Sequence, residues 1–141
     1  MGAETTTDAD IKIRPALIDD LAPIFHLGEI LFTSQKVSNL YRTWDEYAVT
    51  HLFNTEPDYM LVAESGGQVI GFALGSVIEK PRSAWNYGHL VWLGVNPAWH
   101  GQGIGGMLFD RFKNMMIEEG IRMLLVDTQA DNEDAIRLFT H

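Results

Sequence analysis

The sequence of 141 residues contains no cysteine, so it has neither a disulfide nor a thiol nucleophile of its own. It also lacks a run of about 18 consecutive apolar residues, the length that a membrane-spanning helix needs. Basic residues are few: 10 Lys and Arg stand against 19 Asp and Glu, for a formal net charge of −9. Nucleic-acid binding calls for clustered Lys and Arg, so this charge argues against nucleic acid and favours cationic partners. Together these absences predict a cytoplasmic protein without a membrane segment.

Histidine occurs five times, but never at the short spacing that brings several ligands onto one metal ion. We therefore expect no metal site. Residues 1–10 are polar and acidic, and they have neither the basic nor the apolar part of a secretory signal. We expect them to form a flexible acidic tail. Residues 11–141 then make a single domain, because this length suits one hydrophobic core.

Apolar patterns in the first two thirds of the chain predict a strand, two helices and a sheet of consecutive strands. Residues 11–15 alternate as a short strand, and residues 21–32 carry apolar side chains at helical spacing. A second, short helix is expected over residues 44–53. Turns containing glycine or proline separate three further apolar runs, which predict an antiparallel meander over residues 59–63, 69–78 and 85–95.

The last third of the chain is typical of a βαβα unit. Residues 104–119 keep helical spacing and end before Gly120. Residues 123–126 form a short buried strand, and acidic residues at 131–134 favour the start of a final helix. This half, joined to the antiparallel meander, predicts a mixed central sheet and therefore an α/β fold.

Four glycines lie between the last strand of the meander and the next helix, in the segment NPAWHGQGIGGML at residues 96–108. A glycine-rich turn that leads into a helix presents unpaired backbone N–H groups and the positive end of the helix dipole, so it can hold a phosphate without a lysine. Glycine is needed because a side chain would keep the phosphate away from the backbone. A sharp surface turn is the other interpretation of the same residues.

Two known phosphate motifs fit this segment poorly. A P-loop needs Lys and then Ser or Thr after its last glycine, whereas Met107 stands there. Gly101, Gly103 and Gly106 satisfy the dinucleotide fingerprint G-x-G-x-x-G, and Asp127 lies about 20 residues further on. However, five residues separate the preceding strand from the first glycine, and only fourteen residues follow Asp127. Those fourteen residues are too few for the further strands of a dinucleotide-binding fold.

Three segments in register resemble the GNAT superfamily of N-acetyltransferases. Residues 100–108 are similar to the family's pattern Arg/Gln-x-x-Gly-x-Gly/Ala, and residues 93–95 to its Leu-Ala-Val strand end. Residues 132–139 are similar to its later helix, Asn-x-x-Ala-x-x-x-Tyr. The order of the predicted elements agrees with this fold over residues 11–141. The resemblance implies a GNAT fold without its C-terminal strands, since family members continue beyond the position of His141, and a homodimer is one way to complete the sheet.

By this resemblance the chain is an N-acetyltransferase that moves an acetyl or other acyl group from acetyl-CoA to a primary amine. Because there is no cysteine for a covalent acyl intermediate, we expect the amine to attack the thioester directly in a ternary complex. The negative charge favours a small cationic amine or a protein amino group as acceptor. The alternatives are a non-catalytic acyl-CoA-binding or sensing module, and an interaction domain that has lost its ligand.

The resemblance also implies which residues bind the coenzyme. Its pyrophosphate would bind the backbone of the glycine loop, and its pantetheine arm would pair with the strand end before the loop and contact the residue at the start of the last helix. The expected set is Leu93, Val95, His100, Gly101, Gln102, Gly103, Ile104, Gly105, Gly106 and Asn132. His100 departs from the family, in which Arg or Gln is usual at this position, and Asn132 is equally suited to cap the helix.

His89 is the candidate general base. It lies six residues before Val95, where several family members place Glu or His. Strand alternation predicts that it shares one face with Val91, Leu93 and Val95. Imidazole exchanges protons near neutral pH, so it suits a proton relay from the amine. A half-buried structural histidine is the other interpretation.

The general acid is less evident in this sequence. The family's usual tyrosine in the last helix is replaced by Phe139, whose ring cannot donate a proton. Tyr41 and Tyr87 are alternative donors, and a CoA thiolate can also leave without a strong acid.

Overall fold

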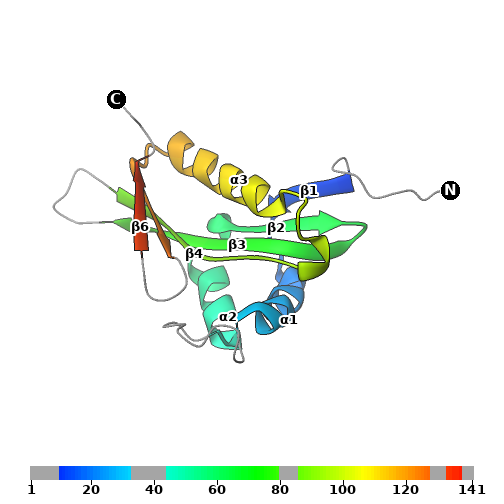
Figure 1. Ribbon diagram of the computed structural model, residues 1–141. Coiled ribbons are helices and arrows are strands. Elements are labelled where there is room, and N and C mark those ends of the chain that lie inside the picture. Colours follow the sequence, from blue (N-terminus) through cyan, green and yellow to red (C-terminus); the bar gives the residue numbers. More distant parts are fainter. Residues whose placement is uncertain (1–9, 33–43, 80–85, 128–132, 138–141) are drawn as a thin grey trace.

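The computed structural model describes residues 10–32, 44–79, 86–127 and 133–137. Six strands form one mixed sheet in sequence order (Figure 1): β1 (Ile11–Pro15), β2 (Met60–Ser65), β3 (Gln68–Glu79), β4 (Asn86–Val95), β5 (Met123–Asp127) and β6 (Glu133–Arg137). Three α-helices accompany the sheet: α1 (Leu21–Phe32), α2 (Glu46–Thr55) and α3 (Ile104–Glu118). Short 3-10 turns occupy Ile18–Asp20, Pro57–Tyr59 and Pro97–Trp99. Within the described ranges, no helix has the length and apolar character needed to cross a membrane.

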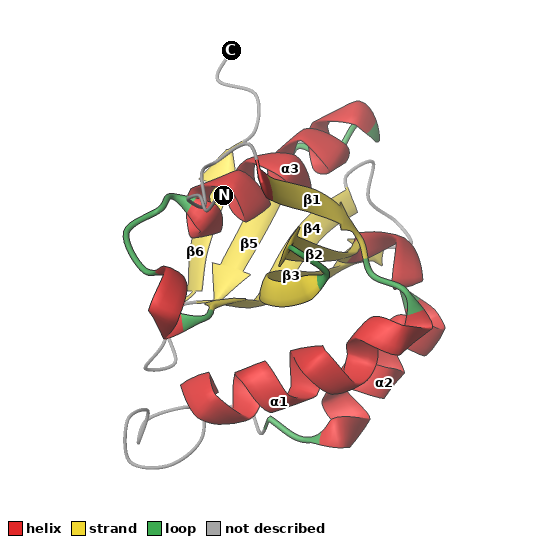
Figure 2. Ribbon diagram, turned by 90° about the vertical axis from the view of Figure 1, so that its right-hand side faces the viewer, coloured by secondary structure: helices red, strands yellow, loops and turns green. Residues whose placement is uncertain are grey.

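The helices cover both faces of the sheet, with α3 on one face and α1 and α2 on the other (Figure 2). Side chains of a strand alternate between faces, so β2 contributes Met60 and Val62 to the core under α1 and α2, and Leu61 and Ala63 to the core under α3. Phe72 and Phe112 are the largest fully buried side chains of these two cores. The sheet is therefore a middle layer with a separate apolar core on each side.

The antiparallel meander is confirmed. β1 pairs with β2, β2 with β3 and β3 with β4, each pair antiparallel, and β4 then pairs in parallel with β5 after the α3 crossover. The predicted span of the first helix, 21–32, agrees with α1. The second helix begins two residues later than predicted, because Asp45 is its N-cap and accepts the Ala48 N–H at 2.8 Å.

The predicted final helix is wrong over residues 133–137. These residues form β6, which pairs antiparallel with β5 from Asp127↔Glu133 to Met123↔Arg137. Acidic residues at 131–134 resemble a helix start, but the outer edge of β5 carries N–H and C=O groups that a following strand can satisfy. The C-terminal half is therefore βαββ over the described residues, in an α/β fold whose mixed sheet agrees with the prediction.

Candidate active site

The loop between β4 and α3 turns at two glycines in the left-handed region, Gly101 with φ 85° and Gly103 with φ 76°. Residues with a side chain rarely adopt this conformation, which accounts for glycine at both positions. Asn96 begins the loop: its side-chain oxygen accepts the Ala98 N–H at 2.9 Å, and its carbonyl accepts the Trp99 N–H at 2.8 Å. Local hydrogen bonds thus shape the turn that leads into α3.

The first turn of α3 presents backbone N–H groups that have no acceptor within the helix. Gly103 is the N-cap, and no side chain of the described residues caps this end. The helical ladder starts with the Met107 N–H, which donates to the Gly103 carbonyl at 3.0 Å, so the N–H groups of residues 104–106 precede it. A Cβ added to Gly106 would meet no described atom within 4 Å. This helix end has the donors and the space to bind an anion.

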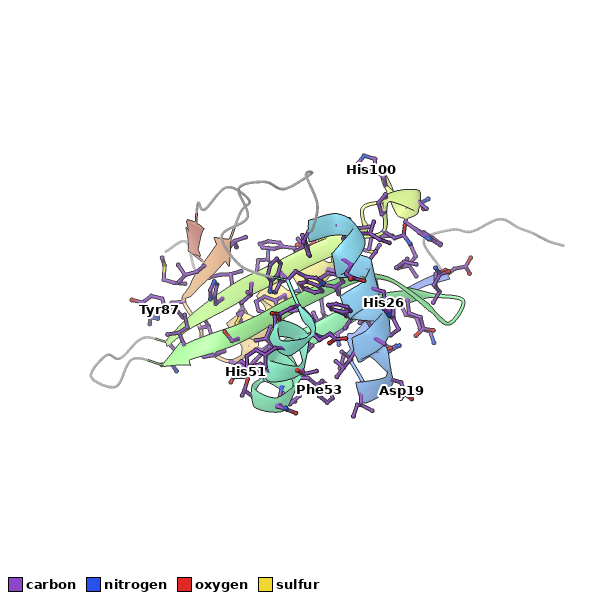
Figure 3. The ribbon with its side chains drawn as sticks, turned by 90° about the horizontal axis from the view of Figure 1, so that it is seen from below. Asp19, His26, His51, Phe53, Tyr87 and His100 are labelled. Carbon is purple, nitrogen blue, oxygen red and sulfur yellow. The ribbon has the colours of Figure 1, made fainter. Side chains whose placement is uncertain are left out.

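The side chains of the predicted coenzyme-binding loop differ in exposure. His100 and Gln102 are exposed, and His100 projects outward from the loop (Figure 3). Ile104 is 1% exposed and belongs to the core under α3, so only its backbone can face a ligand. Asn132 lies outside the described residues, as do Tyr41 and Phe139.

The end of β4 next to this loop has an unpaired edge. β4 pairs with β5 only as far as Leu90, and beyond it no described residue pairs with this side of β4. On the other side, the Asn96 N–H donates to the Ile70 carbonyl at 2.8 Å. Because hydrogen-bonded pairs alternate in an antiparallel ladder, Leu93 and Val95 direct their N–H and C=O groups away from β3. Both predicted strand residues thus present backbone groups at the edge that β5 leaves open.

A β-bulge interrupts β4 just where β5 ends. Leu74 of β3 pairs with Trp92, but Gly75 pairs with Leu90, so β4 has one residue more than β3 between these pairs, Val91. Val91 and Trp92 consequently both pack in the core under α1 and α2. The bulge bends β4 at Val91, where its unpaired edge begins.

The predicted common face of His89 with Leu93 and Val95 is wrong. Strict alternation places them together, but the extra residue at the bulge reverses the alternation, and Val95 packs under α3. His89 lies opposite Ser76 of β3 and shares its face with Val91. The candidate base therefore faces α2.

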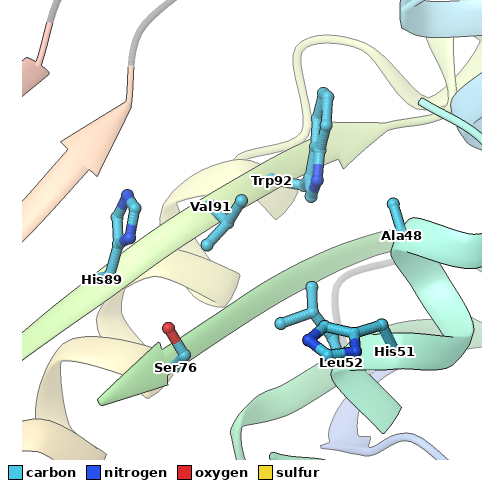
Figure 4. Close-up of a pocket in the computed structure, with 7 residues that line it drawn as sticks. All are labelled: Ala48, His51, Leu52, Ser76, His89, Val91 and Trp92. Carbon is cyan, nitrogen blue, oxygen red and sulfur yellow. The ribbon is translucent and has the colours of Figure 1, made fainter. Parts of the chain in front are cut away.

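A pocket of about 400 Å³ lies between α2 and the bulge of β4 (Figure 4). Its lining comes from α2, β3 and β4: Ala48, His51, Leu52, Ser76, His89, Val91 and Trp92. The His89 side chain is half-buried, and its Nε2 atom is buried. His51 is exposed and stacks on Tyr47, with ring centroids 5.4 Å apart.

Sequence reasoning missed His51 and Ser76 as pocket residues. In the sequence, each of them is marked only as part of a predicted helix or strand. The register of β3 on β4 and the docking of α2 on the sheet bring them to the pocket of His89. Tyr87 is two residues before His89 on β4, but it is not among the pocket residues. It lies far from His100, at the other end of the molecule (Figure 3).

Among the residues that the structure places, no group of three or more His, Asp and Glu side chains could hold a metal ion.

Comparison with known proteins agrees with this architecture. The model of the acetyltransferase (GNAT) family matches residues 24–141. An acetyltransferase of Sodalis glossinidius is 29% identical over 131 residues, which cover 92% of this chain and 83% of that protein. An acetyltransferase of Pectobacterium atrosepticum is 28% identical over 113 residues, 79% of this chain and 76% of that protein.

Solved structures share the fold. The NatC complex bound to Gag peptide and CoA superposes with a TM-score of 0.73 at 20% identity, covering 87% of this chain and 77% of that chain. An aminoglycoside acetyltransferase from an uncultured soil metagenomic sample, in complex with trehalose, gives a TM-score of 0.68 at 22% identity, covering 86% of this chain and 80% of that chain. The chain belongs to the GNAT family of acetyltransferases.

Proposed function

We propose that this acetyltransferase transfers the acetyl group of acetyl-CoA to a primary amine, using the domain of residues 11–141. One observation carries the proposal: a single strand, β4, connects the uncapped N-terminal end of α3, an unpaired backbone edge and a pocket containing a histidine. The coenzyme needs the first two features, and an acceptor needs the third.

The glycine loop and the end of β4 suit coenzyme A. Its pyrophosphate would accept hydrogen bonds from backbone N–H groups of residues 101–106, where Gly106 leaves space for the approach. Its pantetheine arm carries amide groups, which would pair with the backbone of Leu93 and Val95 along the open edge. His100 and Gln102 border the phosphate site, and Asn132 would contact the arm. The thioester then reaches the bulge at Val91, beside the pocket.

The pocket residues would supply the proton transfer. An alkylamine with a pKa near 10.4 is protonated at pH 7, and releasing its lone pair costs about 4.6 kcal/mol. His89 would take this proton directly or through water. The neutral nitrogen then attacks the thioester carbon, the new C–N bond forms and the C–S bond breaks. His89 releases the first proton to solvent and then accepts the extra proton from the nitrogen, while the CoA thiolate takes up a proton from solvent.

A thiol-release assay tests this function. Purified protein is mixed with acetyl-CoA and a panel of amines, and free CoA thiol is measured alongside mass spectrometry of the acetylated amine. We expect thiol release that depends on an amine and yields an N-acetyl product. CoA binding without thiol release for any amine would instead identify a binding or sensing module.

A further inference from the structure

The pocket at His89 has a chemical character that selects among amines, and this selection rests on the proposed function. The pocket lies where the unpaired edge of β4 begins, so an acceptor bound there would sit next to the thioester. Its volume of about 400 Å³ is in the usual range for small-molecule sites, roughly 300–1,000 Å³. The side chains that line it would contact an acceptor bound there.

The lining is mostly apolar and aromatic. Ala48 and Leu52 of α2 face Val91 and Trp92 of β4 across the pocket (Figure 4). The polar side-chain groups are the hydroxyl of Ser76, the indole N–H of Trp92 and two imidazoles. None of the described residues that line the pocket is Asp or Glu. The described part of the lining thus supplies apolar area and proton acceptors, but no carboxylate to pair with a permanent cation.

The acidic side chains of α2 and its neighbours are engaged elsewhere. Glu46 lines a separate pocket against α1. The Glu56 carboxylate accepts the Val77 N–H at 3.1 Å and lines another pocket with Tyr59 and Glu119. Neither of these two carboxylates belongs to the described lining of the His89 pocket.

These observations separate two kinds of acceptor. A polyamine or an amino sugar keeps several positive charges after one nitrogen is deprotonated, and burying an ammonium group without a partner is costly. An amine on an apolar or aromatic body loses its single charge to His89 and then buries its apolar part against the lining. The Tyr47 ring, 71% exposed and stacked on His51, extends the aromatic surface outward along α2.

We infer that the acceptor is a primary amine carried on an apolar or aromatic group, bound in the pocket between α2 and the bulge of β4. His51 and Trp92 contact that group from opposite elements, while His89 faces the amine. The local lining, rather than the overall negative charge, sets the acceptor class.

A steady-state thiol-release assay with acetyl-CoA gives kcat/KM for four amines. Phenylethylamine and tryptamine are compared with spermidine and kanamycin. We expect kcat/KM at least about tenfold higher for the two aromatic amines, the gain from burying one ring. Equal or greater kcat/KM for the polycations would overturn the inference.

A charge introduced into the lining gives a matched comparison. Ala48→Asp adds a carboxylate at the third position of α2, where an acidic residue suits the helix dipole. It should lower the preference for aromatic amines about tenfold or more. Thr50→Asp adds the same charge to the exposed side of α2, at the pocket against α1, and should leave the preference unchanged. An identical shift in both variants would contradict the inference.

A binding measurement separates failure of this inference from failure of the proposed function. Saturation-transfer NMR detects binding of each amine to the protein in the presence of free CoA. This measurement needs no turnover. Aromatic amines that bind wild type more tightly than spermidine does, with this preference reduced in Ala48→Asp, would support the inference even if no thiol is released. Binding of spermidine alone, or of no amine, would overturn it.

Discussion

Arg14 holds Asp20 with two hydrogen bonds: Nη1 donates to Oδ2 at 2.8 Å and Nη2 to Oδ1 at 3.0 Å. The same carboxylate accepts the Leu17 N–H at 2.7 Å, and Arg14 Nε donates to Glu64 Oε1 at 2.6 Å. One guanidinium group therefore ties the turn before α1 to β1 and β2. Asp20 is buried, so this pair matters for stability more than a surface ion pair would.

Asp20→Asn should make the free energy of unfolding less dependent on pH in the acidic range. The Arg14 hydrogen bonds, with help from the Leu17 N–H, hold the pKa of Asp20 below its ordinary value. A lowered folded-state pKa contributes stability above the unfolded pKa and loses it as pH falls through the folded value. We expect the variant to lose about 2 kcal/mol at pH 7 and this difference to narrow as the pH falls below the ordinary Asp pKa of about 3.9. Urea unfolding across pH measures it, and a constant difference would contradict the assignment.

Gly28→Ala should destabilise the protein although alanine is the better helix former. A Cβ at Gly28 would overlap the Trp44 ring, which is buried and whose Nε1 donates to the Phe25 carbonyl at 3.0 Å. The ring cannot move without losing this bond, so we expect a loss of about 1–3 kcal/mol. Thermal unfolding measures the change. Ile30→Ala on the exposed side of α1 is the control, and a higher Tm for Gly28→Ala would refute the packing argument.

Gly106→Leu should weaken coenzyme binding without unfolding the protein. A Cβ at Gly106 meets no described atom within 4 Å, and leucine favours the helix more than glycine does. It would also occupy the approach to the N–H groups of the first turn of α3, so we expect the Kd for CoA to rise at least about tenfold. Calorimetric titration gives the Kd, with Asn114→Ala further along α3 as the control. Unchanged CoA affinity would place the phosphates elsewhere.

His89→Gln should lower turnover more than coenzyme affinity. Loss of a general base typically costs about 100-fold to 10,000-fold in rate, and His89 lies in the pocket rather than at the glycine loop. We expect kcat to fall, KM for acetyl-CoA to change little, and the residual rate to rise with pH as free amine accumulates. His26→Gln, exposed on α1, serves as the matched control. Full turnover of His89→Gln between pH 6 and 9 would remove the base assignment.

Local sequence was sufficient for the glycine loop before α3 and for most of the elements. The glycines at 101 and 103 need positive φ, and the helix after them starts at its first apolar residue, Ile104, so neighbouring residues alone specify this turn. The span of α1 follows in the same way from helical spacing of apolar side chains.

Only the tertiary structure decided which residues share the pocket. The bulge at Val91 depends on pairing with β3, and it reverses the face that alternation assigns to Leu93 and Val95. Likewise β6 forms where acidic residues predict a helix, because the edge of β5 offers hydrogen-bond partners from elsewhere in the chain. Docking of α2 on the sheet brings His51 to the pocket that His89 lines. Local patterns specify backbone conformation over a few residues, whereas register and docking are set by contacts between residues far apart in sequence.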